Sequence, residues 1–137
     1  MPYERFEAWK LCHALVIETY RVTERFPKRE IYGLAAQARR VSFSAAANIA
    51  EGSGKRGPRE FRRYLDISLG SLAELSYIFR VAHDLGYLTP EDSASLHQAR
   101  TLAAIMTWKL YDAMRRARNS RSSPPSPPQT PSSAETA

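Results

Sequence analysis

The fold is decided by the stretch from residue 58 to residue 85, which reads PREFRRYLDISLGSLAELSYIFRVAHDL. Its apolar residues recur every three or four positions, the spacing that places side chains on one face of an α-helix. Pro58 is a favourable first-turn residue, Glu60 complements the positive end of the helix dipole, and Gly86 follows as a stop signal. The pattern therefore predicts one long helix over residues 58–85.

Three more helices are predicted on either side of this one. The same spacing predicts helices over residues 6–25 and 31–51. Thr89-Pro90-Glu91-Asp92 supplies an N-cap, a first-turn proline and first-turn acids for a fourth helix, which we expect to continue to Arg118. No segment reads as a strand. Four helices with short connections predict an all-α, antiparallel up-down four-helix bundle over residues 1–118.

The last nineteen residues, 119–137, differ from the rest of the chain. They contain five of the nine prolines and six serines, with no large apolar residue. Such a segment cannot bury enough apolar surface to offset the entropy of ordering it, so we expect a disordered tail. Its spacing also contains PxxP, the pattern of a polyproline II ligand, although a solubilising tail is the simpler interpretation.

Composition limits the class of protein. The 137 residues carry a net charge of +6 and are 43% hydrophobic, which suits one globular domain with a buried core. No run is long and apolar enough for a membrane helix, and no secretory segment follows the N-terminus, so we expect a cytoplasmic protein. The single cysteine, Cys12, excludes an internal disulfide framework and a cysteine-based zinc site.

The first three predicted helices each have an apolar stripe that we expect to face the core. In the helix over 6–25 this stripe consists of Trp9, Cys12, His13, Val16, Ile17 and Tyr20. In the helix over 31–51 it consists of Leu34, Ala38, Val41, Ala45, Asn48 and Ile49. In the helix over 58–85 it consists of Phe61, Leu65, Leu69, Leu72, Ser76 and Phe79.

The two middle helices also carry a second apolar stripe on the opposite side. A four-helix monomer buries only one side of each helix, so the second stripe predicts contacts between subunits. The residues expected at this subunit interface are Phe43, Ala47, Ile67, Glu74, Ile78 and Val81. The first helix is predicted to lack such a stripe, because its far side is charged.

Two polar residues on the apolar faces are candidates for catalytic groups. Asn48 falls on a core face and Glu74 on the predicted interface. No second carboxylate or histidine stands at a matching position on the same face, so a satisfied structural role is favoured. His13, His83 and His97 have no metal-binding spacing. We therefore predict no catalytic residue, no cofactor and no metal, and a protein that is not an enzyme.

The positive charge is concentrated in part of the chain. Between Arg39 and Arg63, seven basic and two acidic residues give a net charge of +5. The glycine pattern at residues 52–57 fits G-x-G-x-x-G, but a helix precedes it, so a dinucleotide site is not expected. The residues predicted to contact nucleic acid are Arg39, Arg40, Lys55, Arg56, Arg59, Arg62, Arg63, Arg115 and Arg118.

Two aromatic residues, Trp108 and Tyr111, lie near the C-terminal arginines on the side of the last helix that faces away from the core. Arginine beside aromatic side chains suits phosphate contact combined with base stacking. The alternative is that both aromatic rings pack against a neighbouring subunit and the arginines form a solvated rim.

Short motifs in a fixed order give the chain a family resemblance. In order they are FEAWK (6–10), TERFP (23–27), YGL (32–34), QARR (37–40), NIAEG (48–52), EF (60–61), GSLAEL (70–75) and LGYL (85–88). They resemble the four-helix-bundle proteins encoded within 23S ribosomal RNA intervening sequences. The resemblance implies a ring-like homopentamer with no established enzymatic activity. It also links the chain to the accessory variability proteins of diversity-generating retroelements, which bind a reverse transcriptase and nucleic acid.

Two functional hypotheses follow from the residues and the resemblance. The first is a non-enzymatic, oligomeric nucleic-acid-binding accessory protein that assists a reverse transcriptase or acts on structured RNA, with RNA or DNA as its partner. The alternative is a protein-binding scaffold whose basic surface docks an acidic protein partner.

Overall fold

The computed structural model describes residues 1–121 and 127–128, with side chains to residue 117 and at 127–128. Regular structure in these residues is entirely helical, without a strand. The four α-helices are α1 (Glu7–Thr23), α2 (Leu34–Ser53), α3 (Gly57–Asp84) and α4 (Pro90–Arg121), and two short 3-10 helices are η1 (Pro2–Arg5) and η2 (Lys28–Glu30). The all-helical fold and the four helices are therefore confirmed.

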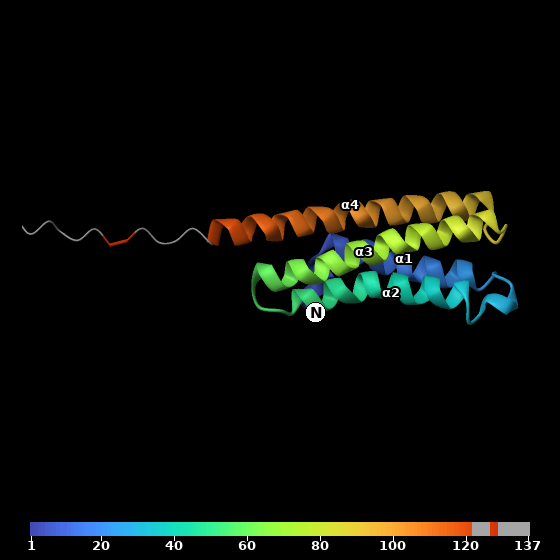
Figure 1. The fold of residues 1–137 in the computed structure, drawn as a ribbon, viewed down its shortest axis with the longest axis horizontal. Coiled ribbons are helices and arrows are strands. Elements are labelled where there is room, and N and C mark those ends of the chain that lie inside the picture. The colour runs from blue at the N-terminus through green and yellow to red at the C-terminus, as the bar shows by residue number, and fades with distance from the viewer. Residues whose placement is uncertain (122–126, 129–137) are drawn as a thin grey trace, which may run out of the picture.

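The four α-helices lie alongside one another (Figure 1). Each helix packs against the next along the chain, and α4 also packs against α1. The α1–α2 and α3–α4 connections lie at one end of the molecule, and the α2–α3 connection lies at the other end. The helix α4 ends at Arg121, three residues beyond the predicted end. The rest of the predicted disordered tail, except 127–128, lies outside the described residues.

Local signals in the sequence set the ends of α3 and α4. Gly57 has φ +84° and precedes Pro58 in the first turn of α3, and Gly86 has φ +77° just after its end. Both backbone conformations favour glycine. The Thr89 hydroxyl accepts a hydrogen bond from the Asp92 N–H at 3.1 Å, the N-cap interaction that the sequence predicted.

The core is built from leucine and isoleucine side chains packed against small residues of α2. Leu15, Ile49, Leu65, Leu72 and Leu96 are fully buried. The buried small residues of α2 are Ala35, Ala38, Ala45, Ala46 and Gly52. They let α3 approach closely enough for the Ser68 hydroxyl to donate a 2.6 Å hydrogen bond to the Ala45 carbonyl.

The predicted core face of α3 is confirmed at Phe61, Leu65, Leu72 and Phe79, which are all buried. The placement of Ile78 on the outer face is wrong, because its side chain is only 4% exposed. Ser68, Leu75 and Ala82 are also buried, so the buried face of α3 is wider than expected and includes Ile78 at its edge. Leu69 and Ser76 are half-buried rather than buried.

The buried face of α1 is rotated around the helix axis by about one residue from the predicted core face. Cys12 and Val16 are buried as expected, but His13, Ile17 and Tyr20 are exposed. Ala8, Leu15, Thr19, Val22 and Thr23 complete the buried face instead. Ile17 and Tyr20 therefore lie on the solvent side of α1, next to a charged far side that is exposed at Glu7, Lys10 and Arg21 as expected.

Candidate nucleic-acid interface

The glycine pattern at residues 52–57 spans the connection between α2 and α3. α2 ends at Ser53 and α3 begins at Gly57, so a helix precedes the loop and the loop is not part of a dinucleotide-binding strand–helix unit. Lys55 and Arg56 lie in the loop, and Arg59, Arg62 and Arg63 follow in the first two turns of α3. Their arrangement matches the sequence-based expectation of basic residues around the start of this helix.

Three of these arginines surround a hollow beside α4. Arg59, Arg62 and Arg63 line a volume of about 300 Å³ together with Tyr111, Glu60 and Asp66. In the part of the chain that the structure describes, Arg56 and these three arginines make no ion pair. We call Arg56, Arg59, Arg62, Arg63 and Tyr111 the α3-start surface.

An aromatic pair extends the α3-start surface along α4. The rings of Trp108 and Tyr111 stack with centroids 5.3 Å apart and an angle of 21° between their planes. Trp108 is 52% exposed, whereas Tyr111 is half-buried and lines the hollow. An exposed indole ring can stack on an unpaired base while the guanidinium groups that surround Tyr111 contact phosphates.

Two predicted binding residues do not join this surface. The Arg39 Nε donates a 2.9 Å hydrogen bond to the Thr23 hydroxyl, and its guanidinium group lies 5.0 Å from the centre of the Tyr20 ring. Arg39 therefore ties α2 to α1. Arg40 is exposed on α2, about 20 Å along the helix axis from the loop.

Other predicted basic residues have acidic neighbours within the subunit. The Lys55 Nζ lies 4.0 Å from a carboxylate oxygen of Glu51. Arg115 and Arg116 both pair with Asp112, at 2.6 and 3.3 Å. The hydrogen bond from Arg115 holds the pKa of Asp112 below its ordinary value. The Arg118 side chain lies outside the described residues.

The polar group predicted in the core, Asn48, is half-buried. Its side-chain amide donates to the Ser44 carbonyl at 2.8 Å and to the Ser44 hydroxyl at 3.1 Å. The Ser71 hydroxyl of α3 donates to the same Ser44 hydroxyl at 3.0 Å. These bonds link α2 and α3 and give Asn48 a structural role.

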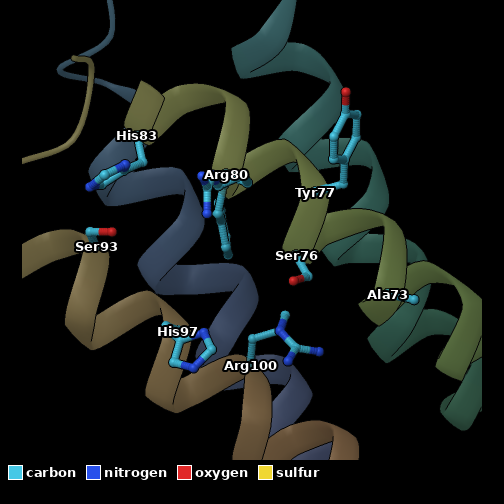
Figure 2. Close-up of a pocket in the computed structure, with 9 residues that line it drawn as sticks. Ala73, Ser76, Tyr77, Arg80, His83, Ser93, His97 and Arg100 are labelled. Atoms are coloured by element: carbon cyan, nitrogen blue, oxygen red, sulfur yellow. The ribbon is translucent and has the colours of Figure 1, made fainter. Parts of the chain in front are cut away.

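Sequence reasoning missed a second cationic site, a groove between α3 and α4. Its volume is about 540 Å³, and its polar lining includes Arg80, His83, His97 and Arg100. Figure 2 shows side chains from α3 facing those from α4 across it. The sequence holds one arginine and one histidine three positions apart on each helix, Arg80 and His83 on α3 and His97 and Arg100 on α4. These pairs can be recognised as one site only when the alignment of the two helices is known.

The described residues were also compared with what a metal site, a reactive thiol and a membrane-spanning helix each require. They contain no group of three or more histidine, cysteine, aspartate or glutamate side chains that could hold a metal ion. Burial raises the pKa of the Cys12 thiol to about 11, so it is protonated at neutral pH and a poor nucleophile. None of the helices in this part of the chain has the length and apolarity needed to cross a membrane.

The fold and the surface together define a small basic helical bundle with arginine and aromatic side chains at one end. The family model for the 23S rRNA-intervening sequence proteins matches residues 4–108. The chain belongs to this family, which confirms the family predicted from its short motifs. A search of the curated proteins found no match.

Proposed function

We propose that this protein is a non-enzymatic, self-associating RNA-binding protein. The observation that carries the proposal is the α3-start surface, where arginines without ion pairs surround Tyr111 next to the exposed Trp108 ring. The name of the family refers to intervening sequences in ribosomal RNA, which supports RNA rather than DNA as the ligand.

The proposed contacts divide into two kinds. Guanidinium groups of Arg59, Arg62 and Arg63 contact phosphates, and their charge attracts any single strand regardless of its sequence. Trp108 and Tyr111 offer stacking faces that need unpaired bases. Single-stranded or looped RNA therefore fits this surface better than a continuous duplex.

Salt dependence tests the phosphate contacts. We compare binding of a fluorescein-labelled single-stranded RNA by anisotropy at several salt concentrations, using Arg59→Gln/Arg63→Gln and a control, Arg21→Gln/Lys28→Gln, that removes the same charge from exposed positions elsewhere. Each single-strand phosphate contact contributes about 0.7 to the logarithmic salt slope. The first variant should lower the slope by about 1.4, and the control should leave it unchanged.

Two results would overturn the RNA-binding proposal. One is the absence of binding at about 50 mM salt, where phosphate contacts are strong. The other is an equal loss of affinity in both double variants, because that would reflect total charge rather than the α3-start surface. A Trp108→Ala variant tests stacking separately, and it should weaken binding to single-stranded RNA more than to duplex RNA.

Self-association is supported by apolar residues on the outer faces of α2 and α3. Phe43 is 60% and Tyr77 is 69% exposed, and Ile67 is also exposed. Glu74 is exposed, while Ala47 and Val81 are half-buried. Burying these side chains against another copy of the chain would remove them from water, and a ring-like homopentamer is the assembly we propose.

Gly70 gives a second, independent reason for proposing this interface. A glycine in a helix interior costs about 0.5–1 kcal/mol relative to alanine. A Cβ at Gly70 would meet nothing within 4 Å in the subunit, so packing within the subunit does not require glycine there. Close approach of a second chain would account for it, because Gly70 lies on the same face of α3 as Ile67, Glu74 and Tyr77.

Light scattering of Gly70→Gln tests the interface, with Ala94→Gln as the control at an exposed position of α4. The unaltered chain and the control should have the same oligomeric mass, and Gly70→Gln should be smaller with unchanged helix content. A monomeric unaltered chain at micromolar concentration, or a Gly70→Gln variant of unchanged mass, would contradict the proposed assembly.

A further inference from the structure

The α3–α4 groove has the composition of an anion site. Among its nine lining residues, two are arginines and two are histidines, and none is aspartate or glutamate. The small side chains of Ala73, Ser76 and Ser93 leave open space between the longer ones. The volume of about 540 Å³ lies within the range of small-molecule sites.

Arg100 is the group that points most directly to a ligand. Its Nε is buried and has no hydrogen-bond partner, and its Nη2 makes only a long 3.4 Å bond to the Thr101 hydroxyl. A guanidinium group is always charged, and a buried donor without an acceptor is costly. Arg100 lines the groove and has no ion pair in the described residues, so an anion bound there would offset the charge of its guanidinium group.

The other donors surround the same space. Figure 2 shows Ser76 of α3 directed toward Arg100, with His97 beside Arg100 on α4. The Ser76 and Ser93 hydroxyls have no hydrogen-bond partner among the described residues. Each imidazole ring offers at least one N–H donor in either protonation state, so serine, histidine and arginine donors face one another across the groove.

One carboxylate lies next to the groove without entering its lining. Asp84 accepts a 3.1 Å hydrogen bond from the Arg80 Nε and lies 3.2 Å from the His83 Nδ1. It therefore offsets part of the charge of Arg80 at that end. Arg100 has no ion pair in the described part of the chain, so the positive charge is strongest toward Arg100.

From these observations we infer that the α3–α4 groove binds a phosphate monoester, with Arg100 as the principal contact and Ser76 and His97 as further donors. The planar fork of an arginine suits a terminal phosphoryl group, which offers several oxygens on one side. The phosphoryl group could belong to the 5′ end of an RNA or to a free nucleotide. This site is separate from the α3-start surface, and different variants test the two.

Calorimetry with matched ligands tests the groove. The probes are an octaribonucleotide with a 5′-phosphate, the same octamer with a 5′-hydroxyl, adenosine 5′-monophosphate and adenosine. We expect the 5′-phosphate to tighten binding about tenfold, the effect of a charge-assisted hydrogen bond. A preference seen with both pairs indicates free nucleotides as a source, and one seen only with the octamers indicates RNA ends.

Variants assign this preference to the groove. Arg100→Leu should abolish the preference for the phosphorylated probes and leave binding of the 5′-hydroxyl octamer unchanged, and the control Arg21→Leu should alter neither. Arg59→Gln/Arg63→Gln should weaken both octamers equally and preserve the preference. His97→Phe should also reduce the preference for the phosphorylated probes. Because His97 is exposed, this variant keeps the test valid if Arg100→Leu disturbs folding.

Two outcomes overturn the inference. Equal affinity for phosphorylated and unphosphorylated probes in the unaltered chain would mean that the groove does not take a phosphate monoester. A preference that survives both Arg100→Leu and His97→Phe would place the phosphate elsewhere. Either result leaves the salt-slope test of the α3-start surface unaffected, so failure of this site is distinguishable from failure of the proposed RNA binding.

Discussion

Gly52 lies at a close approach of α2 and α3, so we predict that Gly52→Ala destabilises the bundle. A Cβ at this position would lie 2.7 Å from the Tyr64 Cβ and 2.9 Å from the Phe61 Cδ1. Carbon atoms in ordinary contact are about 3.5–4.0 Å apart. Relief therefore requires the Phe61 ring to move and α3 to shift at Tyr64, because a Cβ cannot move without its backbone.

Two opposing effects set the magnitude of this loss. Overpacking of a well-packed core costs about 1–3 kcal/mol, whereas replacing a helical glycine by alanine gains at most about 1 kcal/mol. Gly52 is next to the last residue of α2, so the gain is near the lower end of its range. We expect a net loss of about 1–2 kcal/mol in the free energy of unfolding, or about 4–8 °C in Tm for a chain of this size.

Gly54→Ala is the matched control, two residues away. Its Cβ would lie 3.5 Å from the Glu51 carbonyl oxygen, an ordinary contact, and its φ of −88° is open to alanine. This control should be neutral or stabilising by up to about 1 kcal/mol. Guanidinium unfolding followed by far-ultraviolet circular dichroism, at two protein concentrations, gives both values. If Gly52→Ala is as stable as Gly54→Ala, the close approach of α2 and α3 at Gly52 is refuted.

Two further predictions concern buried polar side chains. Ser68→Ala removes the 2.6 Å hydrogen bond to the Ala45 carbonyl and should cost about 1 kcal/mol in the same unfolding assay; an unchanged midpoint would show that this bond contributes nothing. Cys12 has a pKa raised to about 11, from an ordinary value of 9.0, by burial. The folded chain should therefore react with a disulfide reagent at pH 8 far more slowly than the guanidinium-unfolded chain. Burial disfavours the thiolate in the folded chain, so the contribution of Cys12 to the free energy of unfolding is complete below pH 9 and should be lost as the pH rises toward 11. Equal thiol reactivity in the folded and unfolded states would contradict the buried placement of Cys12.

The sequence predicted α3 better than α1 for a physical reason. The core of α3 is formed by large apolar residues such as Leu65 and Leu72, which stand out in a periodic pattern. The buried face of α1 includes Thr19 and Thr23, whose hydroxyls each donate a 2.7 Å hydrogen bond to the carbonyl four residues earlier. Threonines satisfied within their own helix can be buried at little cost, and pattern reasoning counted them as polar.

The predicted basic residues gather only in part on one surface, because a run of charge along the chain is not a surface. Neighbouring residues in a helix point about 100° apart, so Arg39 contacts α1 while Arg40 is exposed. The α3–α4 groove shows the opposite limitation. Arg80 and Arg100 are twenty residues apart in the sequence, and they line one groove only because the α3–α4 connection brings the two helices side by side.

The distribution of ion pairs determines what a salt titration will report. Arg25 pairs with Asp92, Arg80 with Asp84, and Arg115 with Asp112. Exposed pairs of this kind contribute little to stability, but a guanidinium group already held by a carboxylate is a weaker phosphate ligand. The number of released counterions should therefore follow the arginines of the α3-start surface, and not the total of 20 lysines and arginines.

Glu60 and Asp66 line the same hollow as these arginines, and their negative charge weakens its attraction for phosphate. Replacing Asp66 by Asn should therefore tighten RNA binding. The number of phosphate contacts, and thus the salt slope, should stay nearly unchanged. A variant that left affinity unaltered would indicate that RNA does not enter the hollow and contacts only its rim.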